Sequence, residues 1–326
     1  TGRIVGKGYP ADHWETVAQK GFQLVYGSTA NLFTNRNGDY IGYGPEAHEL
    51  VGIPDPETFV QLPWDKRIAR VFCTCFRNRE EENDPGGFLT SDCRGNLKRA
   101  HKEFKEKNGL ELRAGTEPEM MWLTKNEDGT PTGSGFSKPY CYHIDQFESL
   151  RPVYMKVIEY SRFMGLDIIQ GDHEDAPGQL ELNFNFDDVL RNADRLSTYR
   201  QICAQVAREF NLIACFLSKP FVGVSASGCH TNISLWREGE DQLIPCGNDK
   251  KALPGMEQVY HHRRGGDNVF MPDTDDRKIP GQIGLWAIGG VMEHLPALTA
   301  LGSSTVNSYR RLWDTGFWAP VYADWG

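Results

Sequence analysis

The chain has 326 residues, with 35 Lys and Arg against 44 Asp and Glu, which gives a formal net charge of −9. This length can hold one large domain and a smaller one. The negative charge argues against nucleic acid as a main partner, because no excess of Lys and Arg can neutralise phosphates. No apolar run reaches about 18 residues, which argues against a membrane-spanning helix and a membrane partner. The eight cysteines contain no CxxC pair and, without a signal peptide, are interpreted as reduced thiols of a cytoplasmic protein.

The first part of the chain, residues 1–62, is predicted to be a small α+β domain. Prolines at positions 54, 56 and 63 mark its boundary with a larger domain over residues 63–326. The elements predicted in the small domain are a strand at residues 4–5, a helix over residues 11–20 and a strand over residues 22–26.

The larger domain alternates strands and helices. Asp187 or Asp188 is a plausible cap for a core helix, and the polar stretch 238–280 is predicted to run over the surface with a solvated basic block at 261–264. The other predicted elements are strands at 67–76 and 110–123, helices at 96–108, 152–164 and 283–301, and a loop at 124–139.

Residues 171–186 predict two strands joined by a turn at residues 176–178. Glu174 stands just before the turn and Glu181 just after it. Apolar residues at 180, 182, 184 and 186 alternate with polar residues at 181, 183 and 185, the period-2 pattern of a half-buried strand. Glu181 therefore points away from the apolar face. Two carboxylates on neighbouring strands are typical of ligands for a hard metal ion.

A second pair of acids, Glu117 and Glu119, is predicted on the strand 110–123 with both side chains on one face. An exposed strand face is the alternative, but the apolar residues 120–123 indicate a central strand. His230 follows small residues that permit close approach to a ligand; a structural histidine is its alternative. Four Glu and one His suit two Mg²⁺ or Mn²⁺ ions. Such a pair suits phosphoryl transfer from ATP.

These residues lie in blocks that resemble the glutamine synthetase superfamily over nearly the whole chain. The resemblance implies an α+β fold, with a small β-grasp domain over residues 1–62 and a catalytic domain on a curved antiparallel sheet over residues 63–326, packed by helices. Compared with the family pattern, this sequence lacks the first strand of the small domain and an Arg-rich segment after residue 326. Both domains are therefore expected to be incomplete in this sequence. The blocks are Gly2, Gly6-Lys7 and Pro10; Gly115-Thr116-Glu117-Pro118-Glu119; His173 to Glu181; Lys219-Pro220; Ser227 to His230 with Ser234 to Trp236; and Pro296 to Leu312.

The resemblance also implies a role for individual residues. The first metal ion would be held by Glu119, Glu174 and Glu181, and the second by Glu117 and His230. L-Glutamate would contact Glu119, Ser225, Ala226, His230 and Arg311, and ATP would contact Asn232, Ser234 and Phe186. Arg311 would also contact the transferring phosphoryl group; an exposed arginine at a helix end is its alternative.

Two departures from the family pattern concern the amine. Ammonium-using members carry an Asp where this chain has Tyr26 and a Glu where it has Trp318. Those acids attract and deprotonate ammonium, whereas aromatic side chains offer apolar area and faces for stacking. We therefore expect Tyr26 and Trp318 to line a pocket for an organic amine, with an aromatic amine such as aniline as the favoured subclass. The alternative is that both residues only fill core space, or that the alignment slips here.

The resulting functional hypothesis is an ATP-dependent ligase that joins the γ-carboxylate of L-glutamate to an organic amine through γ-glutamyl phosphate. The alternatives are an ammonium-using glutamine synthetase, an alkylamine γ-glutamylamide synthetase, and a non-catalytic structural member of the superfamily. The resemblance further implies hexameric or dodecameric homo-oligomeric rings with the sites at subunit interfaces.

Overall fold

The computed structural model describes residues 4–25, 33–34, 37, 39–41, 49–77, 87–133, 141–240, 242–245, 260–263, 265–272 and 279–312. The chain forms two compact units, Gly2–Asn108 and Gly109–Gly326. Of the helices in this described part, none combines the length and the apolar character needed to cross a bilayer.

The smaller unit is built on an antiparallel sheet in the order β1 (Phe22–Val25), β4 (Glu49–Pro54) and β7 (Cys73–Phe76). Helix α1 (Trp14–Lys20) precedes β1 and ends at Gly21, whose φ of +67° suits a glycine. The core consists of Val17, Phe22, Leu24, Leu50 and Leu89. The remaining elements are 3₁₀ turns at Ala11–His13 and Pro56–Thr58, strands β2 (Phe33–Thr34), β3 (Tyr40–Ile41), β5 (Val60–Leu62) and β6 (Asp65–Arg70), and helix α2 (Cys93–Asn108).

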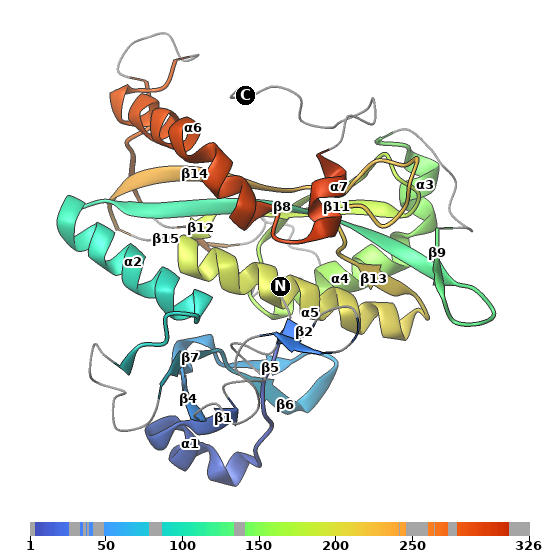
Figure 1. Ribbon diagram of the computed structural model, residues 1–326, viewed down its shortest axis with the longest axis horizontal. Helices are drawn as coiled ribbons and strands as arrows, with labels where there is room; N and C mark the ends of the chain where they lie inside the picture. Colours follow the sequence, from blue (N-terminus) through green and yellow to red (C-terminus); the bar gives the residue numbers. More distant parts are fainter. Residues whose placement is uncertain are drawn as a thin grey trace. The chain divides into compact units, whose positions relative to one another are not determined.

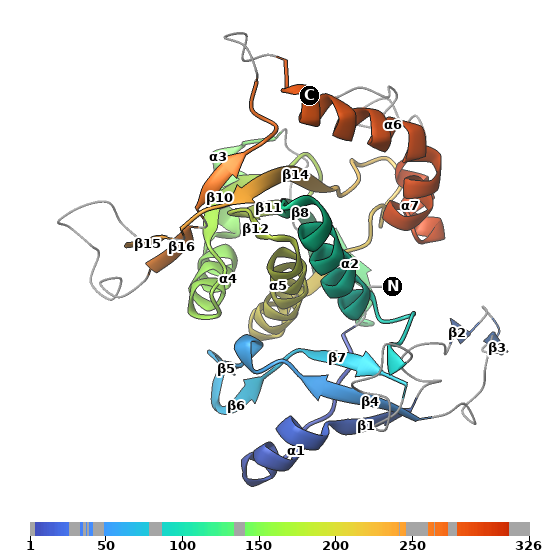
Figure 2. The ribbon, with the colours of Figure 1, turned by 90° about the vertical axis from the view of Figure 1, so that its left-hand side faces the viewer.

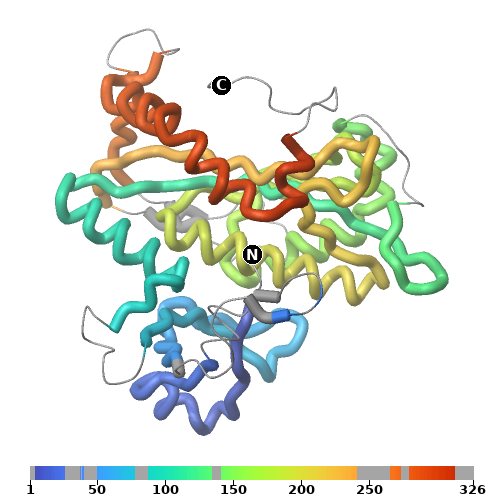
Figure 3. The backbone as a smooth tube through the Cα atoms, in the orientation of Figure 1, coloured from blue at the N-terminus to red at the C-terminus, as the bar shows by residue number. Residues whose placement is uncertain are grey.

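The larger unit is organised around one long strand, β8 (Glu111–Lys125), at the centre of an antiparallel sheet (Figure 1). The sheet order is β10 (Ile168–His173), β11 (Gln179–Phe184), β8, β14 (Cys229–Glu238) and β17 (Gly266–Asn268). The hairpin β10–β11 and the strand β14 are far from β8 in the sequence but lie on either side of it (Figure 3). Three short strands also pair with β8, namely β9 (Pro131–Thr132), β12 (Asp187–Asp188) and β13 (Ile213–Cys215).

Helices α4 (Arg151–Phe163) and α5 (Val189–Glu209) lie side by side against one face of this sheet (Figure 2). Asp188 caps α5 by accepting hydrogen bonds from the backbone N–H groups of Leu190 and Arg191. On the buried side of α5, Tyr199 packs on Phe184 of β11 with ring centroids 6.2 Å apart. The other elements are α3 (Ile144–Ser149), β15 (Gln242–Pro245), β16 (Tyr260–Arg263), α6 (Gln282–Gly302) and α7 (Val306–Arg311).

The architecture confirms the predicted α+β class, with a small N-terminal sheet unit and a larger antiparallel sheet packed by helices. Several local predictions are wrong. Residues 4–10 form no strand, the strand expected over 67–76 is interrupted at residues 71–72, and part of the basic block lies in β16 rather than in a loop. The smaller unit includes β7, so it extends past residue 62; the sequence-based domain boundary there stays a prediction.

Candidate active site

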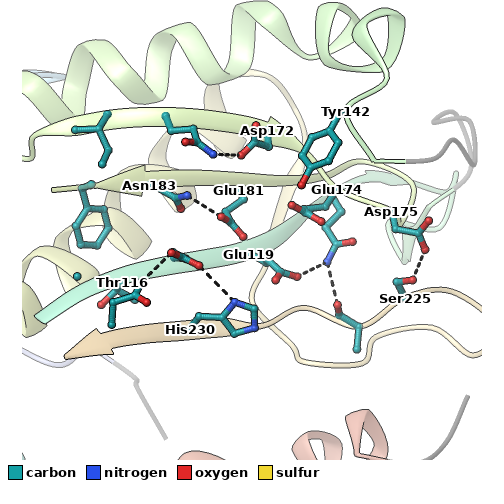
Figure 4. A pocket seen from close by; sticks show the side chains of 18 of the residues that line it. Thr116, Glu119, Tyr142, Asp172, Glu174, Asp175, Glu181, Asn183, Ser225 and His230 are labelled. Carbon is teal, nitrogen blue, oxygen red and sulfur yellow. Dashed lines mark hydrogen bonds and ion pairs between the residues drawn. The ribbon is translucent and has the colours of Figure 1, made fainter. Parts of the chain in front are cut away.

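Three acidic side chains lie in a row across neighbouring strands of the larger sheet. In the strand register, Asp172 of β10 stands opposite Glu181 of β11, and Glu181 stands opposite Glu119 of β8. Opposite residues of antiparallel strands have Cβ atoms about 5 Å apart, so the carboxylates crowd one another (Figure 4). Glu174 follows directly after β10 and lies close to this row of acids.

The predicted alternation of β11 is correct, but the strand is buried on both faces rather than one. Leu180, Leu182 and Phe184 are at most 2% exposed, and on the opposite face Glu181 is only 7% exposed. Burying a carboxylate is costly unless it is paired or hydrogen-bonded. The polar face of β11 must therefore contain partners for its acid.

Amide and backbone donors hold two of these carboxylates. Asn183 donates from Nδ2 to Oε1 of Glu181 over 2.7 Å. Oε2 of Glu119 accepts from Nε2 of Gln179 over 3.1 Å and from the backbone N–H of Gly228 over 2.9 Å. These donors fix the orientation of the accepting carboxylate oxygens.

The crowding also perturbs the acids electrostatically. Burial first, and then repulsion by Glu119, Glu181 and Asp172, raises the pKa of Glu174 to about 7. Burial also raises the pKa of Glu181, against the lowering effect of the hydrogen bond from Asn183. A cation among these side chains would offset both the repulsion and the loss of hydration.

A second group of side chains lies along β14, on the other side of β8. His230 stands opposite Glu117 in the register, and its Nδ1 is 3.4 Å from Oε2 of that carboxylate. Asn232 donates from Nδ2 to Oε1 of Glu117 over 2.8 Å. Gly228 lies close to the polar ends of these side chains: an added Cβ would lie 2.7 Å from Oε1 of Glu119 and 3.2 Å from Nη2 of Arg311.

A cavity of about 600 Å³ joins the two groups. Most of the predicted site residues line this cavity. Ser234 does not: it lies farther along β14, where its Oγ accepts a hydrogen bond from Nε1 of Trp236, so its contact with ATP stays a prediction. Tyr26 and Trp318 lie outside the described residues. The predicted residues that line the cavity are Glu117, Glu119, Glu174, Glu181, Phe186, Ser225, Ala226, His230, Asn232 and Arg311.

Phe186 has a different environment from the one that strand alternation alone would give it. β11 ends at Phe184, so Phe186 leaves the core face and is 43% exposed. Its ring stacks on Trp236 with centroids 5.6 Å apart and an interplanar angle of 20°. One exposed aromatic face therefore borders the cavity.

Sequence reasoning missed several residues that line the cavity. Gln179 and Asn183 could have been found, because they lie two residues on either side of Glu181 and therefore on the same face of β11. Asp172 depends on the hairpin register, and Asp175 forms a hydrogen bond with Ser225 across 50 residues of sequence. Tyr142 adopts a φ of +65°, rare for a bulky residue, and its ring lies beside Glu174 (Figure 4).

The donor set fits hard divalent cations, although its present arrangement is not a finished coordination sphere. Among the residues that the structure describes, no three His, Cys, Asp or Glu side chains form a group ready to hold one ion. Carboxylate oxygens and an imidazole are nevertheless the ligands that Mg²⁺ and Mn²⁺ take. The raised pKa values of Glu174 and Glu181 indicate acids that a cation would stabilise. Filling such a site therefore requires side-chain rotations, for which His230 and Glu117, with side chains 58% and 36% exposed, have room.

Comparison with known proteins gives one family. Residues 90–262 and 258–326 match the model of the glutamine synthetase catalytic domain. Glutamine synthetase from Pyrococcus furiosus is 34% identical over 286 residues, which cover 87% of this chain and 55% of that protein. The chain thus spans about half the length of this relative.

Two solved structures give the same fold. The structure "Apo GmaS without ligand" superposes with a TM-score of 0.74 at 25% identity, over 93% of this chain and 61% of that one. The structure "GmaS/ADP complex-Conformation 1" gives a TM-score of 0.72 at 26% identity, over 93% and 60%.

Proposed function

The chain belongs to the glutamine synthetase family, and from this premise we propose that the protein joins the γ-carboxylate of L-glutamate to an amine at the expense of ATP. The observation that supports this most is the convergence of four Glu, one His and Arg311 on one cavity of about 600 Å³. A structural protein has no need to crowd buried acids against one another, because like charges on opposite strand positions are destabilising.

The two groups of side chains would serve two divalent cations, Mg²⁺ or Mn²⁺. Glu119, Glu174 and Glu181 would hold one ion, and Glu117 and His230 the other. Ions bound there would neutralise the negative charge on the phosphoryl group in transfer.

Glutamate would bind between the 225–228 loop and Arg311. Nε of Arg311 is buried without a hydrogen-bond partner among the described residues, and a guanidinium donor without a partner suits an incoming carboxylate or phosphoryl oxygen. Ser225 and Ala226 line the same part of the cavity. These residues would align the γ-carboxylate for attack on the γ-phosphorus of ATP, which releases ADP and gives γ-glutamyl phosphate. An amine would then attack the acyl carbon, lose a proton and displace the phosphate to leave the γ-glutamyl amide.

ATP would bind at the end of the cavity that Phe186 and Asn232 line. The exposed face of Phe186, stacked from behind by Trp236, suits an adenine ring, because bases stack on aromatic side chains. The similar protein GmaS has been solved as a complex with ADP.

For the amine, we propose an organic compound rather than ammonium, and an aromatic amine such as aniline as the first candidate. This proposal rests on Tyr26 and Trp318, which replace two acids of the ammonium-using pattern. An alkylamine is the second candidate, because two of the similar solved structures are of GmaS, a γ-glutamylmethylamide synthetase. The family resemblance also supports homo-oligomeric rings.

A panel of amines tests this function. Full-length protein would be supplied with L-glutamate, ATP and Mg²⁺ or Mn²⁺, and ADP release and the γ-glutamyl product would be measured with aniline, methylamine and ammonium. We expect the fastest turnover with an organic amine. If ammonium were turned over as fast as any organic amine, the amine proposal would be overturned. If no amine led to ADP release, the ligase proposal would be overturned.

A further inference from the structure

The side chain of Gln179 forms hydrogen bonds with several parts of the candidate site. The residue is buried and only 1% exposed. Oε1 accepts a hydrogen bond from the backbone N–H of Ala176 over 2.9 Å, which fixes the orientation of the amide. Nε2 then donates to Oε2 of Glu119 over 3.1 Å, to the carbonyl of Ala226 over 3.2 Å and to Oγ of Ser227 over 3.2 Å.

The amide thus links two parts of the site that the sequence holds far apart. Glu119 lies on β8 and is a candidate ligand of the first cation. Ala226 and Ser227 belong to the 225–228 loop, which borders the candidate glutamate site. Gly228 of the same loop donates its N–H to the same oxygen of Glu119 over 2.9 Å.

We propose that Gln179 is a positioning residue that couples the carboxylate of Glu119 to the 225–228 loop, so that divalent cation and L-glutamate each bind more tightly when the other is bound. The proposal rests on the proposed function, because it takes the cation and glutamate as the ligands. Two amide hydrogens serve three acceptors, so a rotation of Glu119 toward a cation changes the bonding available to the loop. A coupling of this kind is reciprocal by thermodynamic necessity.

Asn183 provides a matched control. It lies on the same face of β11 as Gln179 and donates to a candidate ligand of the same cation, Glu181. Among the residues that the structure describes, its side chain forms a hydrogen bond only with that carboxylate, so it would support the cation without a link to the 225–228 loop.

The test measures binding rather than turnover in the full-length protein. The dissociation constant of Mn²⁺ would be determined by titration calorimetry with and without saturating L-glutamate, and that of L-glutamate with and without Mn²⁺. The wild type, Gln179→Met and Asn183→Leu would be compared, with thermal melting as the check of folding. Ser227→Ala, a milder change in the same link, would be measured in parallel and tests the coupling even if Gln179→Met fails to fold.

We expect both ligands to bind several-fold more tightly together than apart in the wild type. In Gln179→Met that ratio should fall to near one, and in Ser227→Ala it should fall part of the way. Asn183→Leu should weaken Mn²⁺ binding by about 10-fold, as is usual for a lost supporting hydrogen bond, and keep the wild-type ratio.

A wild type that binds both ligands with a ratio near one, or a wild-type ratio retained in Gln179→Met and Ser227→Ala, would overturn the coupling and leave the proposed function intact. A wild type that binds neither Mn²⁺ nor glutamate would overturn both.

Discussion

The two sides of the cavity differ in how firmly they hold their acids. On the β11 side, Gln179 and Glu181 are 1% and 7% exposed, and amide donors fix the carboxylates of Glu119 and Glu181. On the β14 side, the side chains of His230 and Glu117 are 58% and 36% exposed. The buried side is therefore preorganised, which lowers the cost of ordering it on binding. The open side must order its side chains when the ligand arrives.

Removal of a charge from the buried side should cause the largest loss of activity. Glu119→Gln keeps the size of the side chain but removes a candidate cation ligand. We expect activity to fall by about 1,000-fold or more, as for the loss of a group that stabilises the charge of the transition state. The melting temperature should fall little, because the repulsion between residue 119 and Glu181 is relieved. Assays of ADP release and Mn²⁺ binding check this, with Glu127→Gln in an exposed turn as the matched control. Full activity in Glu119→Gln would contradict the assignment of the buried side.

A change at Gly228 disturbs both sides at once. The added methyl of Gly228→Ala would lie 2.7 Å from Oε1 of Glu119 and 3.1 Å from Nε2 of His230. We expect kcat/KM to fall by about 100-fold, the loss that a misplacement of about 1 Å can cause. Gly289→Ala is the control, because no atom lies within 4 Å of its added Cβ and its activity should be unchanged. Equal activity of the two variants would mean that the close packing at Gly228 has no functional role.

A change confined to the open side should have a smaller and more selective effect. His230→Ala removes one of the two ligands proposed for the second cation. We expect activity to fall by about 30-fold, equivalent to about 2 kcal/mol in the barrier, while the tightest Mn²⁺ binding step stays near the wild-type value. Mn²⁺ titration of the variant separates the two sides. If His230→Ala weakened that tightest step as much as Glu119→Gln does, the division into two cation sites would be wrong.

The smallest effect is expected at the end of the cavity that Phe186 lines. Phe186→Ala removes the exposed ring but leaves Trp236 in place. We expect the KM for ATP to rise about 10-fold, since stacking on an aromatic ring contributes about 1–3 kcal/mol, while the KM for glutamate stays the same. Initial-rate kinetics with each substrate varied in turn checks this. A rise in the KM for glutamate alone would place the ring at the other substrate.

Residues near one another in the sequence were the predictable part of the site. The period of two in a strand placed Glu117 and Glu119 on one face, and it placed Glu181 away from the apolar face of β11. Metal-ligand chemistry linked these acids to His230, the family resemblance added Arg311, and all five residues line the cavity.

Features that depend on tertiary contacts could not be predicted in this way. Asp172 faces Glu181 only through the register of the hairpin, and the bonds of Gln179 depend on a loop 47 residues away. Phe186 was expected to share a face with core residues in bare alternation, but the chain leaves the strand after Phe184. Tyr26 and Trp318 lie outside the described residues, so their role in the amine pocket rests on sequence alone.

The most direct test of the central claim is anomalous diffraction from crystals of the full-length protein grown with Mn²⁺. We predict two manganese peaks in the cavity, one beside Glu119, Glu174 and Glu181 and the other beside Glu117 and His230. The absence of any manganese peak in the cavity would contradict the assignment of these residues as the metal site of a glutamate–amine ligase.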